Sequence, residues 1–215
     1  MDTRIKERTI KWKQTIIFSM FVLLAAQINF DIFTTYFRVS LGIIMIPILI
    51  FLFQRIPLLP VTVLSGIGVW LSRALFSGVQ NGFAGQELWN YFPELVFYLV
   101  YGFLVWFYFR KKDYKIQGWK SYCFLLLADY CANFFELFLR LQGDALTMKL
   151  QSKILLIALI RTVLLWVILT GLGSYKLELL TQEHASRYQR LLLLISKLNG
   201  EVIWMKKNTE LIEKT

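Results

Sequence analysis

The sequence predicts an all-α protein, a six-helix transmembrane bundle followed by a cytoplasmic amphipathic or coiled-coil helix. Three observations support this fold class. Of the 215 residues, 57% are apolar and only 18% are charged, an apolar content above that of an ordinary soluble domain. Six separate segments before residue 175 are apolar enough to cross a bilayer. After residue 175 the apolar residues become periodic and charged residues become frequent.

The six apolar segments have lengths near the roughly 17–25 residues that a spanning helix needs, although the second and third are short. Pro47 is expected to kink the second segment, because proline removes a helical hydrogen bond. Soluble core helices are the alternative for any single segment, but six in one short chain favour membrane spans. The expected spans are residues 16–33, 39–53, 61–76, 91–109, 122–141 and 154–175.

The basic residues predict the orientation in the membrane. Residues 1–13 and the loop 110–120 each hold five lysines and arginines, whereas the loop 77–90 holds none. Excess positive charge stays on the cytoplasmic side, so both termini are expected in the cytoplasm. The expected domains are a basic N-terminus (1–13), a six-span region (14–175) and a linker helix (176–215). Arg140, Lys149 and Lys153 lie on the opposite side of this topology and oppose it.

Several function classes are not expected. The net charge of +10 lies in loops between apolar runs rather than on a polar domain, so no nucleic-acid partner is predicted. Cys123 and Cys131 are about 12 Å apart on a helix, too far for a disulfide. His184 is the only histidine, so neither a metal site nor another cofactor is predicted. The sequence lacks a phosphate-binding glycine motif, an H-box and a nucleophile with its base, and an enzyme is therefore not expected.

Charged and polar residues inside the expected spans are the candidate functional residues, because ionisable groups at membrane depth are costly and usually face a cavity or a partner. In the fifth span they recur at steps of four, three and four, which places them on one stripe of a helix. The expected topology puts most of the others in the outer half of the bundle. The candidate ligand-binding residues are Arg73, Glu94, Asp129, Asn133, Glu136, Arg140 and Arg161.

These residues, together with Asp31 and Arg38, make four acids and four bases whose formal charges cancel. A neutral cavity of mixed sign suits a zwitterion, with arginine holding a carboxylate and an acid holding an ammonium group. The alternative is internal pairing that sets helix register and binds nothing. Both readings stay open at this point.

The C-terminal segment predicts self-association. Apolar residues from Tyr188 to Ile212 follow alternating steps of three and four, the spacing of a coiled-coil seam. Gly200 and Thr209 weaken this pattern, and the alternative is an amphipathic helix lying on the membrane. The expected homodimer seam consists of Leu191, Ile195, Leu198, Val202, Met205 and Ile212.

Several stretches resemble a known family. FRVSLGIIMIPILIFLFQRIP, VTVLSGIGVWLSRALF and YFPELVFYLVYGFL resemble the membrane sensor region of bacterial two-component histidine kinases of the glutamine-sensing type. RYQRLLLLISKLNGEVIWMKKNTELIEKT is similar to the linker that joins such a region to the kinase core. The resemblance implies an input module without its kinase core, which senses a small molecule or envelope state. Its expected partners are membrane lipids, a second copy, a cytoplasmic kinase core or other downstream signalling protein, and a small ligand.

Two other functions remain as alternatives. A substrate-capture subunit of a metabolite or vitamin importer is also a compact helical membrane protein and would use the same outer cavity. A membrane scaffold would use the tail to recruit a soluble protein. The cytoplasmic segment of about 40 residues favours the sensor, because a capture subunit needs no extended coiled coil.

Overall fold

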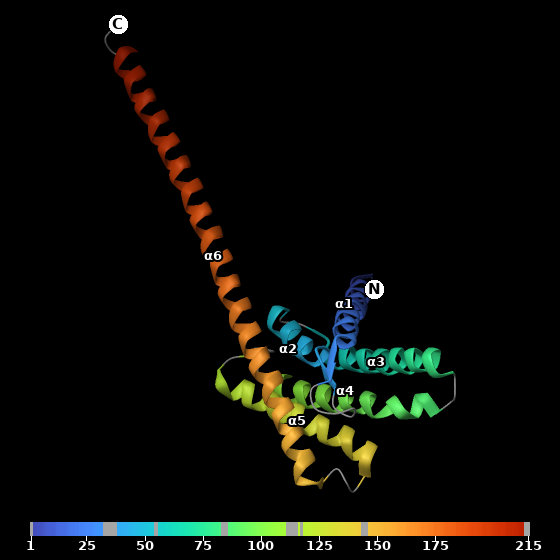
Figure 1. Cartoon of the computed structure of the whole chain (residues 1–215). Coiled ribbons are helices and arrows are strands. Elements are labelled where there is room, and N and C mark those ends of the chain that lie inside the picture. The colour runs from blue at the N-terminus through green and yellow to red at the C-terminus, as the bar shows by residue number, and fades with distance from the viewer. Residues whose placement is uncertain are drawn as a thin grey trace. The chain divides into compact units, whose positions relative to one another are not determined.

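The computed structural model describes residues 2–31, 38–53, 56–82, 86–110, 116, 118–142 and 146–212 (Figure 1). Nearly all of these residues are helical, so the all-α class is confirmed. Two strands of three residues each, β1 (Asn29–Asp31) and β2 (Arg38–Ser40), form an antiparallel pair that was not predicted. The helices are α1 (Asp2–Gln27), α2 (Gly42–Leu52), α3 (Leu58–Asn81), α4 (Gln86–Arg110), α5 (Trp119–Leu141) and α6 (Met148–Ile212).

Four helices in the described part of the chain are long and apolar enough to cross a membrane, and they suggest a membrane protein. They are Leu58–Gln80, Leu88–Arg110, Trp119–Leu141 and Met148–Val202. The predicted count of six spans is therefore wrong. α2 has 11 residues, which at 1.5 Å per residue reach about 17 Å, roughly half of a hydrocarbon core.

The reason for the difference is that apolar composition does not show where a helix stops. The expected span 16–33 runs past the end of α1 at Gln27 and into β1, and the expected span 39–53 begins inside β2. α1 contributes only about twelve apolar or small residues between Gln14 and Gln27. The chain therefore turns through a short hairpin where the apolar pattern alone suggested two longer helices.

The chain divides into two compact units, Met1–Leu169 and Thr170–Thr215. Within the first unit, α3 packs against α4, α4 against α5, and α1 against both α2 and α3; Figure 1 shows α3 and α4 side by side. The described N-terminal part of α6 packs against α5 through Leu137, Ile154 and Ile157. Tyr130 of α5 also donates a hydrogen bond to Gln151 Oε1 at 2.6 Å.

Gly102 permits the close approach of α4 to α3. A Cβ atom at this position would overlap the side chain of Thr62. We expect Gly102→Ala to destabilise the first unit by about 1–3 kcal/mol, because the extra methyl group forces neighbouring helices apart. Thermal unfolding in detergent measures this effect. Gly171→Ala is the control, since a Cβ there meets nothing within 4 Å, and equal stability of the two variants would contradict the prediction.

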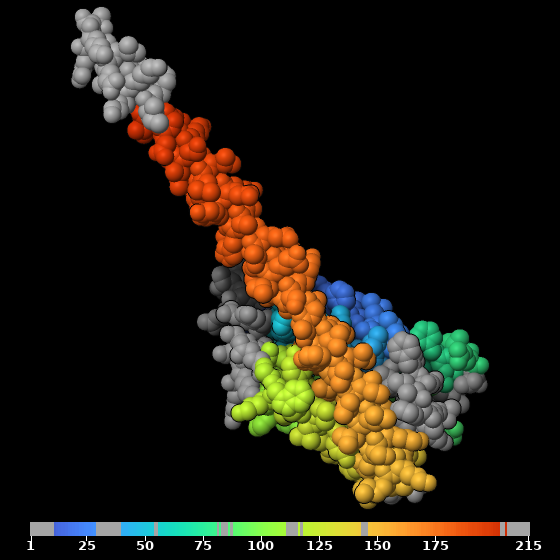
Figure 2. Space-filling model, turned by 60° about the vertical axis from the view of Figure 1, so that its left-hand side comes forward, coloured from blue at the N-terminus to red at the C-terminus, as the bar shows by residue number. Residues whose placement is uncertain are grey.

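The second unit is the C-terminal part of α6, and Figure 2 shows its residues up to about 202 as a single helix. From Tyr175 on, its described apolar side chains are exposed in the single chain. Leu191 and Leu198 are 58% and 59% exposed. The side chain of Ile212 lies outside the described residues. The coiled-coil seam stays a prediction.

Candidate functional site

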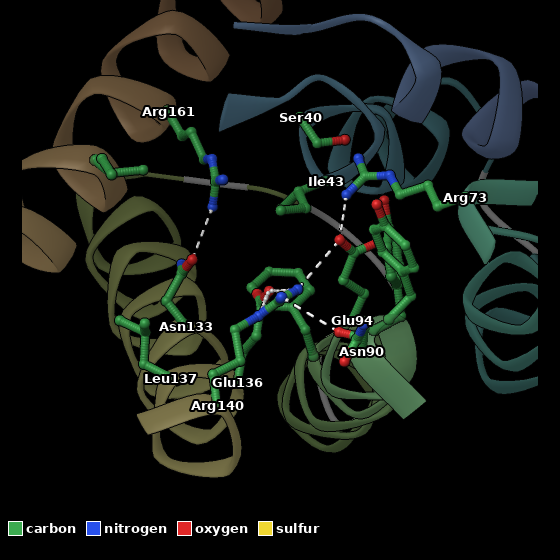
Figure 3. Close-up of a pocket in the computed structure, with 14 residues that line it drawn as sticks. Ser40, Ile43, Arg73, Asn90, Glu94, Asn133, Glu136, Leu137, Arg140 and Arg161 are labelled. Carbon is green, nitrogen blue, oxygen red and sulfur yellow. Dashed lines mark hydrogen bonds and ion pairs between the residues drawn. The ribbon is translucent and has the colours of Figure 1, made fainter. Parts of the chain in front are cut away.

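A polar cavity of about 270 Å³ lies inside the first unit (Figure 3). It is bounded by residues of β2, α2, α3, α4, α5 and the first half of α6. Five charged side chains line it, and Figure 3 shows them pointing into the cavity from these helices. The lining residues are Ser40, Ile43, Arg73, Asn90, Tyr91, Glu94, Phe97, Tyr98, Asn133, Glu136, Leu137, Arg140, Ile157 and Arg161.

The structure brings the predicted ligand-binding residues together. Arg73, Glu94, Asn133, Glu136, Arg140 and Arg161 all line the cavity. Asp129 does not line it but contacts Arg161 directly behind the wall. The side chains of Asp31 and Arg38, which were expected near the same end of the bundle, lie outside the described residues.

One wall of the cavity is an ion-pair network of Arg73, Glu94, Glu136 and Arg140, here called the Glu94 network. Glu94 Oε1 lies 2.6 Å from Arg73 Nη1 and 3.2 Å from Arg140 Nη2. Arg140 also pairs with Glu136, one turn earlier on α5, at 3.0 Å. One carboxylate oxygen thus joins α3 to α4 and α4 to α5, so the network sets the relative positions of three helices.

The arginines of this network also bind the backbone. Arg73 Nη2 donates to the carbonyl oxygen of Ala26 at 3.2 Å, in the last turn of α1, where carbonyl groups lack helical partners. Ser40 Oγ donates to the same oxygen at 3.4 Å. A cation at a helix C-terminus is also favoured by the helix dipole. Arg73 therefore connects the end of α1 to the cavity wall.

The opposite wall holds a second group, made by Arg161 of α6 with Asp129 and Asn133 of α5. Arg161 Nη1 donates to Asp129 Oδ1 at 2.9 Å and to Asn133 Oδ1 at 3.4 Å. Asn133 Nδ2 donates to Asp129 Oδ1 at 2.8 Å. The side chains of Arg161 and Asp129 are only 5% and 4% exposed. Ion pairs this deeply buried hold their helices strongly, because separating them leaves a charge in a medium that solvates it poorly.

The formal charges of the two groups balance. Three arginines face three carboxylates, counting Asp129. The lining itself has three arginines and two glutamates, a formal charge of +1. Among the described residues, Glu94 Oε2 and Asp129 Oδ2 accept no hydrogen bond although both are buried. Buried polar atoms are nearly always hydrogen-bonded, and Glu94, unlike Asp129, lines the cavity, so Glu94 Oε2 is the candidate contact point for a bound molecule.

Several lining residues were not predicted. Asn90, Tyr91, Phe97 and Tyr98 lie three or four residues from Glu94, and the helical period places them on its face of α4. Applying the helical period to the residues before and after Glu94 would have placed these four residues on the same face of α4. Ser40 and Ile43 follow from the hairpin and α2, and no periodic signal in the sequence points to them.

No protein-family model, no curated protein and no solved structure matches this chain. The fold and the site define a helical protein with four candidate membrane spans and a buried, charged cavity. Within the described ranges, no cluster of three or more histidine, cysteine, aspartate or glutamate side chains is suited to hold a metal ion.

Proposed function

We propose that this chain is the input module of a bacterial membrane signalling protein. It binds a small polar ligand in the cavity and transmits the binding through α6 to a dimeric cytoplasmic helix and a kinase. The observation that carries the proposal is that Arg161, which lines the cavity, and the seam residues belong to one helix, Met148–Ile212. A shift of α6 at the cavity is transmitted to the seam along the same helix.

Signalling requires two arrangements of the module whose balance the ligand changes through different affinities. The Arg161–Asp129 pair is the contact through which the cavity holds α6 to α5. A ligand that attracts Arg161, or competes for Asn133, favours a different position of α6. Helix shifts of about 1–2 Å at subunit interfaces are a known form of such transitions, and the proposal needs no larger movement.

The proposed location is the bacterial cytoplasmic membrane with both termini in the cytoplasm. The basic segments 1–13 and 110–120 support this orientation. An even number of crossings keeps both termini on one side, and four spans satisfy this condition as six do. Labelling of single cysteines introduced at Thr3 and Glu210 in intact and permeabilised cells tests the orientation. Labelling in intact cells would contradict it.

A substrate-capture subunit is the second candidate, because an importer would use the same charged cavity. The two functions differ in the tail. A sensor needs the helix after residue 170 for its output, whereas a capture subunit needs only a docking face for its energising partner. Deleting residues 190–215 should therefore leave uptake of a metabolite intact for a capture subunit and abolish the response of a sensor.

A flexible insertion after Tyr175 tests the proposed relay. We expect three inserted glycines to preserve ligand binding and abolish the ligand-dependent response, because glycine is among the weakest helix formers and interrupts the continuous helix α6. The response is the rate of disulfide cross-linking at Leu198→Cys, measured with Cys123 and Cys131 replaced by serine and with standard amino acids as trial ligands.

An insertion of one helical heptad at the same place is the control, because it lengthens the helix and nearly preserves the direction of the seam. We expect it to keep a ligand-dependent change in cross-linking. If the glycine variant responds as the unmodified chain does, the relay through α6 is wrong. The reading frame and neighbouring genes at the native locus give an independent test, since the proposal requires a kinase core encoded there.

A further inference from the structure

We propose that the cavity binds a small zwitterion whose ammonium group carries at least one N–H, and that Glu94 Oε2 is the acceptor for this N–H. The inference deepens the proposed function by naming the ligand class. It rests on that function for the relay, but binding itself is tested separately. Its basis is the combination of a buried unpartnered carboxylate oxygen, the charge of the lining and the size of the cavity.

Glu94 supplies the first part of the argument. Glu94 is 6% exposed and lines the cavity. Figure 3 shows its carboxylate among the arginines. Both arginine contacts go to Oε1, at 2.6 and 3.2 Å, whereas Oε2 accepts no hydrogen bond from the described residues. A buried charged acceptor without a donor is costly, and a charged donor forms the strongest bond to it. An ammonium N–H satisfies both conditions.

The charge of the lining supplies the second part. With Asp129 behind the wall included, the charged side chains of the two groups are three arginines and three carboxylates, and their formal charges cancel, so a simple cation or a simple anion would leave the buried site with a net charge. A zwitterion brings its own carboxylate and leaves the total unchanged. Arginine is also the side chain best suited to bind a carboxylate in two places. The requirement for a donor at Glu94 and the formal neutrality of the site together select a molecule with both signs.

The two groups of the cavity indicate how the zwitterion lies. Figure 3 shows Arg161 and Asn133 across the cavity from Glu94 and Arg73. With the ammonium at Glu94, the carboxylate extends toward the Arg161 side, where it interacts with the positive charge of α6. Phe97, Leu137 and Ile157 contribute apolar lining, which accommodates a short carbon chain between the charged ends. A bound zwitterion therefore interacts with Arg161, which belongs to α6, the helix that transmits the signal in the proposed function.

The volume limits the size of the ligand. At roughly 30 Å³ per water molecule, 270 Å³ corresponds to about nine waters. Pockets for drug-sized ligands begin at about 300 Å³, so the cavity suits a smaller metabolite. Free amino acids and short ω-amino acids have the right charges, donors and size.

The experiment measures binding to the full chain in nanodiscs by calorimetry and by thermal stabilisation. The probes are the standard amino acids and the ω-amino acids from β-alanine to aminohexanoate. Each probe that binds is compared with its N-trimethyl analogue, which keeps both charges and lacks every N–H. We expect at least one parent zwitterion to bind and its analogue to bind about tenfold to a hundredfold more weakly. The N-acetyl and methyl ester forms, each lacking one charge, should also bind weakly.

Glu94→Gln provides the variant test and Glu178→Gln, an exposed position in α6, the matched control. We expect the control to bind as the unmodified chain does and Glu94→Gln to lose the preference for the parent over the trimethyl analogue. If Glu94→Gln does not fold, the analogue series on the unmodified chain decides alone. Equal binding of parent and analogue, or binding by none of the probes, overturns the inference. N–H-dependent binding without a change in Leu198→Cys cross-linking supports the inference and refutes the proposed relay.

Discussion

Arg161→Ala is expected to lower the free energy of unfolding by about 3–5 kcal/mol. The substitution leaves the carboxylate of Asp129 buried at 4% side-chain exposure without its cation, and breaking a buried ion pair from one side is strongly destabilising. It also removes the donor to Asn133, so α6 loses both polar contacts to this stripe of α5. Thermal or denaturant unfolding of the purified chain in nanodiscs measures the loss.

A double variant separates the missing pair from other effects of the substitution. Asp129→Leu combined with Arg161→Leu removes both charges, and apolar pairs of similar volume often match or exceed a buried ion pair. We expect the double variant to recover most of the lost stability, and Lys176→Ala, an exposed basic position in α6, to change it little. A double variant as unstable as Arg161→Ala would contradict the assignment of the loss to an unpaired carboxylate.

The same reasoning decides which residue tests ligand binding. Arg161→Ala alters the cavity and the attachment of α6 at once, so loss of binding in that variant has two causes. Glu94→Gln keeps a hydrogen-bonding group of the same shape beside Arg73 and Arg140. Because Glu94→Gln also removes a charge from the network that joins three helices, its readout of recognition is the ratio of parent to trimethyl-analogue binding rather than the affinity itself, and the Arg161 variants are the probe of helix attachment.

Leu198→Asp is expected to weaken self-association at least about a hundredfold. Burial of a leucine side chain contributes about 1.5–3 kcal/mol, each copy of the dimer loses this contribution, and every 1.4 kcal/mol is a factor of ten. The new carboxylates also face one another across the seam. Light scattering and concentration-dependent cross-linking of the full chain in detergent measure the change in the monomer–dimer equilibrium.

Leu193→Asp is the matched control for the seam. Leu193 is 71% exposed and lies on the side of the helix opposite to Leu191, Ile195 and Leu198, since two residues correspond to about 200° of rotation. We expect it to leave the equilibrium nearly unchanged. If both aspartate variants weaken association equally, the helix does not associate through the predicted seam. If neither does, the second unit does not self-associate through this helix.

The structure shows which helices the apolar pattern of the sequence predicts and where that pattern fails. The long apolar runs correctly indicate α3, α4, α5 and the first half of α6, because each run exceeds the length of any strand or buried loop. Patterning fails at residues 16–53, where the two expected spans cover the end of α1, the β1–β2 pair and the short α2. The sequence is similarly apolar on both sides of each point where one of these elements ends. The breaks between these elements accompany the backbone pairing of β1 with β2 and the packing of α2 against α1, and a local window of sequence contains neither.

The sequence by itself determined that charged residues share one stripe of α5, because helical spacing of four, three and four requires it. It also determined that the tail is periodic and that no catalytic motif occurs. Only the tertiary structure decided the partners: Glu94 binds Arg73 and Arg140, whereas Asp129 binds Arg161. Each of these pairs joins different helices, and balanced charges alone permit many pairings. Packing of α3 on α4 and of α4 on α5 selects one of them, and it leaves Oε2 of the cavity residue Glu94 without a hydrogen bond from the part of the chain that the structure describes.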